Sequence, residues 1–383
     1  MKRSIIISVF CFILSIPEIY PQEKKSLTLN GYLTAMPSIM FDSLSGGISN
    51  DILIHNRLNF KYFPDKYLTL ALELRNRVFK GDMVSSNIEY PEMIGNDPGL
   101  VDMSWNILEK HSFLINTTID RCWIDYNRGK FQVRVGRQRI NWGQTLVWNP
   151  NDIFNAYSFF DFDYVERPGS DAVRLQYFPG SSSAIEIAVK ADKDKDITAA
   201  ALYRFNKWGY DIQLLAGYAD DNDFVAGTGW SGSIGSLSFR GEATWFQPVE
   251  NFRNTTGRGL FTTGIDKVFK DNSMVQFQVM YCNDPPDFTD FNSLYSADIS
   301  AKDLAFSRFT AFTQFSYFAT PLLNLSISAM WFPDLKGYFA GPSLDYSLAE
   351  NIDLSLFWQY FGNRLSGIRN RIKLGFIRLK YSF

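Results

Sequence analysis

The sequence has little of what soluble enzymes use for catalysis or metal binding. Its 383 residues include only two histidines, His55 and His111, and three cysteines. Neither histidine stands beside a recognisable nucleophile motif such as G-x-S-x-G, so we do not expect an enzyme. The alternating carboxylates at residues 192–196 lack the glycine and the distal glutamate of a calcium loop. We therefore expect no metal and no cofactor.

The sequence also lacks a long apolar run and a large charge of either sign. The formal net charge is −2, which gives no reason to expect a nucleic-acid partner. A mean hydropathy of −0.14 excludes a bundle of transmembrane helices. What the chain has in excess is aromatic residues, with 34 Phe, 19 Tyr and 9 Trp. Membrane β-barrels place such rings toward lipid, and every second residue of their strands can still face water.

The N-terminus has the features of an export signal. Lys2 and Arg3 are basic, and the run from Ile5 to Ile16 is apolar but too short to span a bilayer. Polar sequence begins at Gln22, where we place the cleavage site. We therefore expect a signal peptide over residues 1–22 and an outer-membrane barrel over residues 23–383.

After this leader, apolar and polar residues alternate in runs of about ten, which is the period of half-buried β-strands. Residues 68–75 and 354–360 are examples. Short turns and longer loops alternate between the runs, as periplasmic turns and extracellular loops do in membrane barrels. Residues 80–111 form one of the expected long loops. The pattern predicts an all-β, transmembrane, antiparallel up-and-down barrel of about 18 strands, with sixteen as the alternative. A barrel of this size encloses a water-filled lumen.

The last strand carries a pattern of its own, in which four apolar residues occupy alternate positions: Ile377, Leu379, Tyr381 and Phe383. This pattern resembles the terminal strand of outer-membrane barrels. The resemblance implies that the barrel-insertion machinery reads these residues. Together with the leader, it predicts a place in the outer membrane, with lipid and that machinery as partners. The oligomeric state stays open.

If the apolar positions face lipid, their charged neighbours face the pore. The main candidates for lumen and selectivity residues are then Arg57, Lys61, Glu73, Arg75, Arg77, Arg134, Arg174, Arg240, Glu242 and Arg308. The full set also contains Lys190, Arg371, Lys373, Glu186, Asp211, Asp345 and Asp353. Basic positions outnumber acidic ones, which predicts a pore that prefers anions. The alternative is that opposite charges pair into ladders and confer no selectivity.

The most distinctive segment runs from Gly136 to Gly169 and is rich in Trp, Phe, Asn and Pro. It is too apolar for a freely solvated loop. We predict a loop folded into the barrel mouth and pinned there by Arg137, Arg139, Trp142, Asn149, Asp152 and Arg167. The three arginines would pair with Asp152, Asp161 or Asp163. The alternatives are an aromatic site that stacks on sugars and an aromatic girdle on the outside.

Within this segment, the spacing of the Gly-Arg-Gln, Trp-Gly, Asn-Pro and Arg-Pro-Gly groups, with Asp152, resembles a group of porin-like barrels. That group includes alginate-export-type channels and related, largely uncharacterised outer-membrane families. The resemblance covers about forty residues. It implies a porin-like channel for small hydrophilic solutes. The alternatives are a substrate-specific exporter of polysaccharide or oligosaccharide and a non-conducting structural or adhesive barrel.

Overall fold

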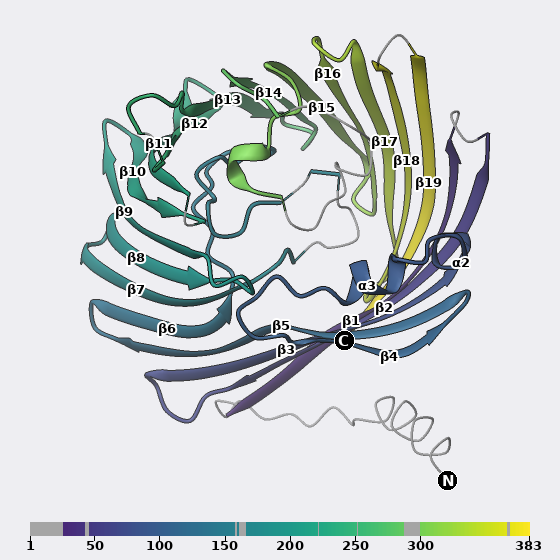
Figure 1. Ribbon diagram of the computed structural model, residues 1–383, viewed down its shortest axis with the longest axis horizontal. Helices are drawn as coiled ribbons and strands as arrows, with labels where there is room; N and C mark the ends of the chain where they lie inside the picture. The colour runs from purple at the N-terminus through teal and green to yellow at the C-terminus, as the bar shows by residue number, and fades with distance from the viewer. Residues whose placement is uncertain are drawn as a thin grey trace.

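The computed structural model describes residues 26–42, 46–157, 159–160, 166–220, 222–250, 252–286, 299–365 and 368–383. The expected signal peptide lies outside these residues. Within them, the chain forms a closed antiparallel β-barrel (Figure 1). The predicted fold class is therefore confirmed.

Nineteen strands are present in the described residues, and eighteen of them make the closed wall. The wall strands are β1 (Leu27–Asp42), β2 (Ile48–Tyr62), β3 (Leu68–Gly81), β5 (Phe113–Arg128), β6 (Phe131–Gln138), β7 (Ser170–Gly180), β8 (Ser183–Ala191), β9 (Ile197–Lys207), β10 (Tyr210–Ala219), β11 (Asp223–Ile234), β12 (Leu237–Pro248), β13 (Arg258–Val268), β14 (Met274–Cys282), β15 (Phe309–Thr320), β16 (Leu323–Phe332), β17 (Gly337–Ala349), β18 (Ile352–Leu365) and β19 (Ile368–Ser382). The remaining strand, β4 (Ser104–Lys110), pairs with β5.

The barrel closes where the first strand pairs with the last. The β1–β19 register runs from Tyr32 opposite Ser382 to Asp42 opposite Ile372. Beyond it, Gly31 and Phe383 exchange backbone hydrogen bonds of 2.9 and 3.0 Å. Because the wall has an even number of strands, the start of β1 and the end of β19 lie at the same end of the barrel.

The connections alternate in length, as the sequence predicts. At the end of the barrel that holds Phe383, residues 129–130, 181–182, 208–209 and 235–236 form two-residue turns. Gly129, Gly209 and Gly235 have positive φ values of 64°, 78° and 60°, which two-residue hairpin turns require. At the opposite end the connections include the long segments 82–112, 139–169 and 283–308.

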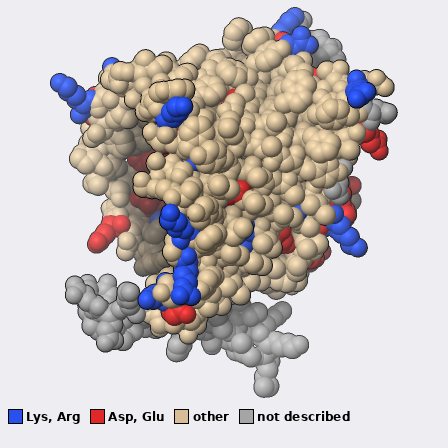
Figure 2. Space-filling view, turned by 90° about the vertical axis from the view of Figure 1, so that its left-hand side faces the viewer, with Lys and Arg blue, Asp and Glu red and all other residues tan. Residues whose placement is uncertain are grey.

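Apolar side chains at alternate strand positions form a band around the outside of the barrel. On β8, for example, Ile185, Ile187 and Val189 are 39, 47 and 43% exposed. The four C-terminal residues 377, 379, 381 and 383 lie on the same face and are 40 to 47% exposed. Figure 2 shows a broad uncharged surface with most Lys and Arg side chains toward its margins. A soluble protein rarely exposes so continuous an apolar surface, whereas a lipid-facing barrel requires one.

In the described residues, three short helices lie in the connections: α2 (Asp82–Ser86), α3 (Tyr90–Gly95) and the 3₁₀ helix η2 (Ala301–Asp303). In Figure 1, α3 lies inside the ring of strands. Val84 of α2 is buried with three inward-facing apolar residues of β2, β3 and β5, namely Leu53, Phe79 and Leu114. No helix in the described part of the chain is long and apolar enough to cross a membrane.

The sequence did not predict β4, because its residues fall within the expected loop at 80–111. β4 pairs with one end of β5, from Ser104 opposite Thr118 to Lys110 opposite Phe113. β6 pairs with the other end of β5, starting at Cys122 opposite Arg137. β4 therefore continues the wall beyond the point where β6 ends and the chain turns into the lumen.

Candidate functional site in the barrel lumen

The segment that follows β6 folds into the lumen, where it runs as the teal trace inside the ring of Figure 1. Its rings are buried, with Trp142 1%, Trp148 3%, Phe154 3% and Phe160 2% exposed. They pack in one cluster with inward-facing residues of β9 to β18, including Leu202, Leu215, Phe246, Phe312, Phe339 and Phe361. These four rings therefore form neither an outer girdle nor a stacking surface open to a sugar.

The carboxylate of Glu242, on β12, binds the backbone of this segment. Its Oε1 accepts hydrogen bonds from the backbone N–H groups of Gln144 and Thr145, and its Oε2 accepts one from Asn151 at 2.9 Å. The side chain is 0% exposed. The sequence places Glu242 among the pore-facing residues, but the segment covers it and separates it from the open lumen.

Other polar side chains of the inner wall bind the same segment. Gln213 on β10 donates to the carbonyl of Trp142 at 2.6 Å, and Gln278 on β14 accepts from the N–H of Val147 at 3.1 Å. The indole of Trp142 donates to Glu186 on β8 at 2.6 Å. Four wall strands, β8, β10, β12 and β14, therefore contact the segment through polar side chains.

Two of the residues predicted to pin the loop make contacts within it. The side chain of Asn149 donates to the hydroxyl of Tyr157 at 2.9 Å. Oδ1 of Asp152 accepts from the N–H of Trp142 at 3.3 Å, while Oδ2 has no hydrogen-bond partner among the described residues. Asp152 is 0% exposed.

Arg137 pairs with two acids outside the loop, Asp97 and Asp171. It lies at the end of β6, where its guanidinium forms two 2.8 Å hydrogen bonds with Asp171 on β7 and one of 2.6 Å with Asp97. It also donates to the carbonyl of Val101 at 2.7 Å. Arg137 therefore joins the segment 97–101 to the wall, beside the place where β6 ends.

Arg139 and Arg167 lie near Asp152 but, within the described part of the chain, neither forms an ion pair with it. Asp161 and Asp163 are outside the described residues. The guanidinium of Arg167 lies over the ring of Tyr157, 2.9 Å from its centre. Burial raises the pKa of Asp152 to about 7, although the positive charges of Arg139 and, more weakly, Arg167 oppose this. Burial also lowers the pKa of Arg167 to about 10, and Arg139 acts in the same direction.

We expect the stability of the docked segment to depend on pH in the wild type, and to depend on it less in the variant Asp152→Asn. The pKa of Asp152 is higher in the folded protein than in the unfolded chain, so this carboxyl favours the folded state most at low pH. That contribution is lost as the pH rises through about 7. Hydrogen exchange of peptides from residues 139–157 should therefore speed up in the wild type as the pH rises from about 4 to about 7, after correction for intrinsic rates, and it should level off above pH 7. The opposite trend, or an equal trend in the variant, would show that Asp152 does not titrate there.

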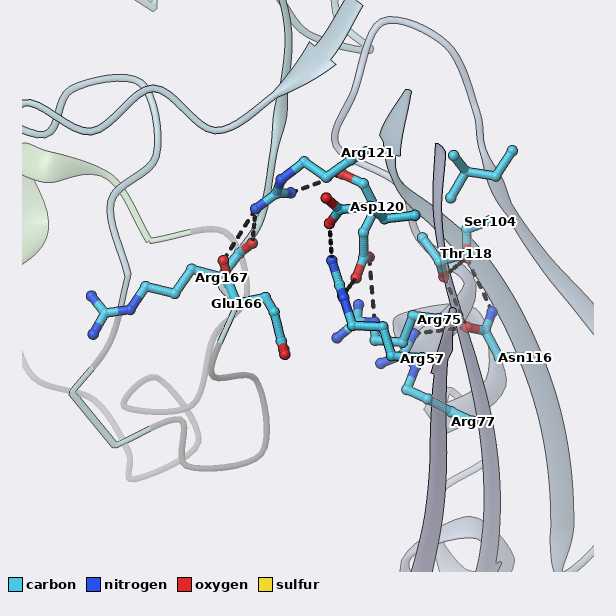
Figure 3. Close-up of polar contacts among 12 residues, drawn as sticks. Arg57, Arg75, Arg77, Ser104, Asn116, Thr118, Asp120, Arg121, Glu166 and Arg167 are labelled. Atoms are coloured by element: carbon cyan, nitrogen blue, oxygen red, sulfur yellow. Dashed lines mark hydrogen bonds and ion pairs between the residues drawn. The ribbon is translucent and has the colours of Figure 1, made fainter. Parts of the chain in front are cut away.

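A network of arginines and acids covers the inner face of β2, β3 and β5 (Figure 3). Arg57 binds Asp120 and also Glu73, the latter at 2.6 Å, and Arg75 lies 3.4 Å from Asp120. Arg121 donates to the carbonyls of residues 166 and 167 at 3.1 and 2.6 Å. The returning end of the inward segment is thus attached to β5.

A β-bulge makes this network possible. The β3–β5 register shifts between Glu73 and Leu74. As a result, two consecutive residues, Asp120 and Arg121, both reach the inside of the wall, which regular alternation would forbid. Sequence alternation missed both residues, because nothing in the local composition marks the bulge.

Elsewhere on the inner wall, basic residues pair with acids on neighbouring strands. Arg134 lies 2.8 Å from Asp125, Arg174 3.8 Å from Glu186, and Arg240 3.1 Å from Asp266. A further pair joins Lys190 on β8 to Asp220, which follows the end of β10, at 3.6 Å. These pairs match the alternative in which opposite charges form ladders.

Several predicted lumen residues have other surroundings. Arg57 is 0% exposed and so does not face open water. Arg371 and Lys373 share the outward face of β19 with Ile377, while Arg378 and Lys380 take the inward positions. The reason is that alternation within β19 continues without a shift from residue 371 to residue 381. Arg308 precedes β15 and lies outside any strand.

The remaining predicted lumen residues keep their inward positions. Arg77 on β3 donates to the side-chain oxygen of Asn116 at 2.8 Å and to the carbonyl of Ile94 at 3.3 Å. Lys61 is exposed near the end of β2.

The sequence matches no protein-family model and no curated protein. Solved structures do match it. OccK11 (OpdR) of Pseudomonas aeruginosa matches with a TM-score of 0.60 and 9% identity, over 93% of this chain and 96% of that one. OccK5 (OpdH) of the same organism matches with a TM-score of 0.60 and 9% identity, over 93 and 98%. OccAB3 of Acinetobacter baumannii matches with a TM-score of 0.59 and 8% identity, over 93 and 99%.

The chain has the fold of the Occ and Opd barrels. The likeness extends over nearly the whole of both chains, and it agrees with the predicted antiparallel barrel fold. At 8 to 9% identity, it shows the fold alone. The resemblance to alginate-export-type channels stays a local one, because no family model matches.

Proposed function

We propose that this protein is an outer-membrane channel that passes small hydrophilic solutes. The observation that carries the proposal is the closed wall of eighteen strands, apolar outside and lined with paired charges inside. Barrels of sixteen to eighteen strands are wide enough to hold an aqueous channel. The segment 139–157 fills part of that width, so we expect it to limit the size of the solute.

Liposome swelling tests this proposal without an electric field. Liposomes containing the refolded mature chain should become permeable to small sugars and amino acids, and the rate should fall steeply as the solute becomes larger. The same preparation unfolded by heat before reconstitution is the control. A folded barrel that admits none of these solutes would contradict the proposal and favour the non-conducting barrel.

We also propose that the channel prefers anions weakly. The inner face of β2, β3 and β5 carries five basic residues, Arg57, Lys61, Arg75, Arg77 and Arg121, against four acidic ones, Asp51, Glu73, Asp120 and Asp125. The charge pairs elsewhere on the wall largely cancel, so this arc is where a preference would arise. The excess is modest, and we expect a modest selectivity.

Arg77→Gln should lower any anion preference. The substitution removes one positive charge from the arc, and a glutamine can still donate to Asn116. In a salt gradient, the wild-type reversal potential should favour anions, and the variant should move it toward zero. Arg371→Gln removes the same charge from the outward face and is the matched control. A wild-type potential that favours cations would contradict the assignment.

The pattern at the end of β19 supports a further part of the proposal, recognition by the barrel-insertion machinery. Deleting Phe383 should then reduce the fraction of heat-modifiable barrel in the outer membrane of expressing cells. Replacing the neighbouring Ser382 with alanine should leave that fraction unchanged. Equal insertion of both variants would argue against recognition through Phe383.

The second candidate, an exporter of polysaccharide or oligosaccharide, has only the local sequence resemblance behind it. The rings that would stack on sugars, Trp142, Trp148, Phe154 and Phe160, are buried against the wall. We therefore propose the channel for small solutes in preference to the exporter.

A further inference from the structure

Glu242 is an unusual residue for the inner wall of an aqueous barrel. Its neighbours on the same face of β12 include Arg240, which is partly exposed and lies 3.1 Å from Asp266. Glu242 itself is 0% exposed. Three backbone N–H groups of the inward segment, from Gln144, Thr145 and Asn151, donate to its two oxygens.

The charge of Glu242 depends on that segment for its stabilisation. Among the described residues, no Lys or Arg nitrogen lies within the 4.0 Å of an ion pair with this carboxylate. The N–H groups that surround it supply the compensating dipoles, as backbone amides do around a bound anion. A buried carboxylate without such partners is strongly unfavourable. Glu242 and the docked segment are thus energetically coupled.

Uncharged hydrogen bonds also join the inward segment to the wall. Asn151 donates from its side chain to the carbonyl of Thr228 on β11 at 3.1 Å and accepts from the hydroxyl of Thr244 on β12 at 2.7 Å. The segment is therefore fixed to adjacent strands at residues 144–145 and again at residue 151. Between these points, Val147 and Trp148 pack into the apolar cluster.

We propose that Glu242 is the positioning residue that holds the segment 139–157 as a fixed constriction. The aperture of the pore then depends on this carboxylate, although the carboxylate never touches a passing solute. This inference rests on the proposed function of the chain as a channel. It further implies that the pore does not open and close by releasing the segment.

Glu242→Gln tests the inference, since glutamine has nearly the same shape but brings an N–H group where an acceptor is needed. Asp125→Asn, which removes the same charge from the lumen without touching the segment, is the matched control. Peptides covering residues 139–157 should exchange amide hydrogen about tenfold faster or more in Glu242→Gln. The same peptides of Asp125→Asn should exchange as in the wild type, and so, in both variants, should peptides from strands away from β5 and β6, where Asp125 pairs with Arg134.

Single-channel recording gives the second readout. Glu242→Gln should show a larger and more fluctuating conductance than the wild type, and Asp125→Asn should not. A folded Glu242→Gln barrel with wild-type exchange and wild-type conductance would overturn the inference. If exchange rises while neither protein conducts, Glu242 does hold the segment and the proposed channel function is what fails.

A reversible crosslink tests the same point with Glu242 in place. The pair Asn151→Cys and Thr244→Cys, with Cys122 and Cys282 replaced by serine and alanine, would join the segment to β12. Because the segment is already fixed, oxidation should leave conductance and its fluctuations unchanged. In the Glu242→Gln background, oxidation should restore the wild-type conductance, and reduction should remove it again. Openings abolished by the crosslink in the presence of Glu242 would show a mobile gate and overturn the inference.

Discussion

Arg137→Leu is expected to lower the stability of the barrel by about 3 to 5 kcal/mol, the usual effect of breaking a buried ion pair. Arg137 and its partners Asp97 and Asp171 have side-chain exposures of 4, 4 and 10%. Leucine would leave two carboxylates enclosed with no cation. It would also remove the attachment of the segment 97–101 beside the end of β6. Urea unfolding of the barrel in detergent micelles or lipid vesicles measures the change.

Two further substitutions make this prediction specific. Arg128→Leu removes an exposed arginine from the end of β5 and should change the stability little. Arg137→Lys keeps the charge but loses the planar guanidinium that reaches Asp171 through two nitrogens. The stability of this variant should therefore lie between that of the wild type and that of Arg137→Leu. If Arg137→Leu proved as stable as Arg128→Leu, the wall would not depend on this network.

Replacing residues 139–169 with Asn-Gly is expected to raise the single-channel conductance several-fold and to admit larger solutes. Gln138 and Ser170 lie directly opposite each other in the β6–β7 register, so a two-residue hairpin can join the strands there. The replacement removes the segment that fills the lumen beside β8 to β18. Conductance and swelling rates for a series of sugars measure both effects.

The control for this variant is a deletion of residues 252–256, which are exposed in the β12–β13 loop. It shortens a loop at the same end of the barrel without entering the apolar cluster, and it should leave conductance near the wild-type value. A folded barrel without residues 139–169 that conducts like the wild type would mean that the constriction lies elsewhere.

The wall of the barrel follows from the sequence because side-chain direction in a strand has a period of two residues. A run such as residues 68–75 gives both the strand and its lipid-facing side. Turn residues such as Gly129 and Gly235 mark where strands end, and counting those turns predicted about eighteen strands. The same period correctly places Arg134, Arg174 and Arg240 on the inside.

The contents of the lumen do not follow from the sequence. Alternation shows which face of a strand a residue lies on, but not which distant residue it contacts across the lumen. Asp97 is forty positions before Arg137 and lies in a connection with no regular period. Glu242 has the pattern of any pore-facing acid, and only the fold shows that residues 144–151 cover it. The bulge at Asp120 and the strand β4 are further local departures that depend on long-range pairing.

The most direct test of the central claim is the conductance of the mature wild-type chain, refolded and inserted into a planar lipid bilayer. The channel account predicts stable unitary steps. It also predicts no large spontaneous openings, because Glu242 holds the inward segment in place. A barrel shown to be folded by its heat-modifiable migration, yet giving no steps in concentrated salt, would contradict it.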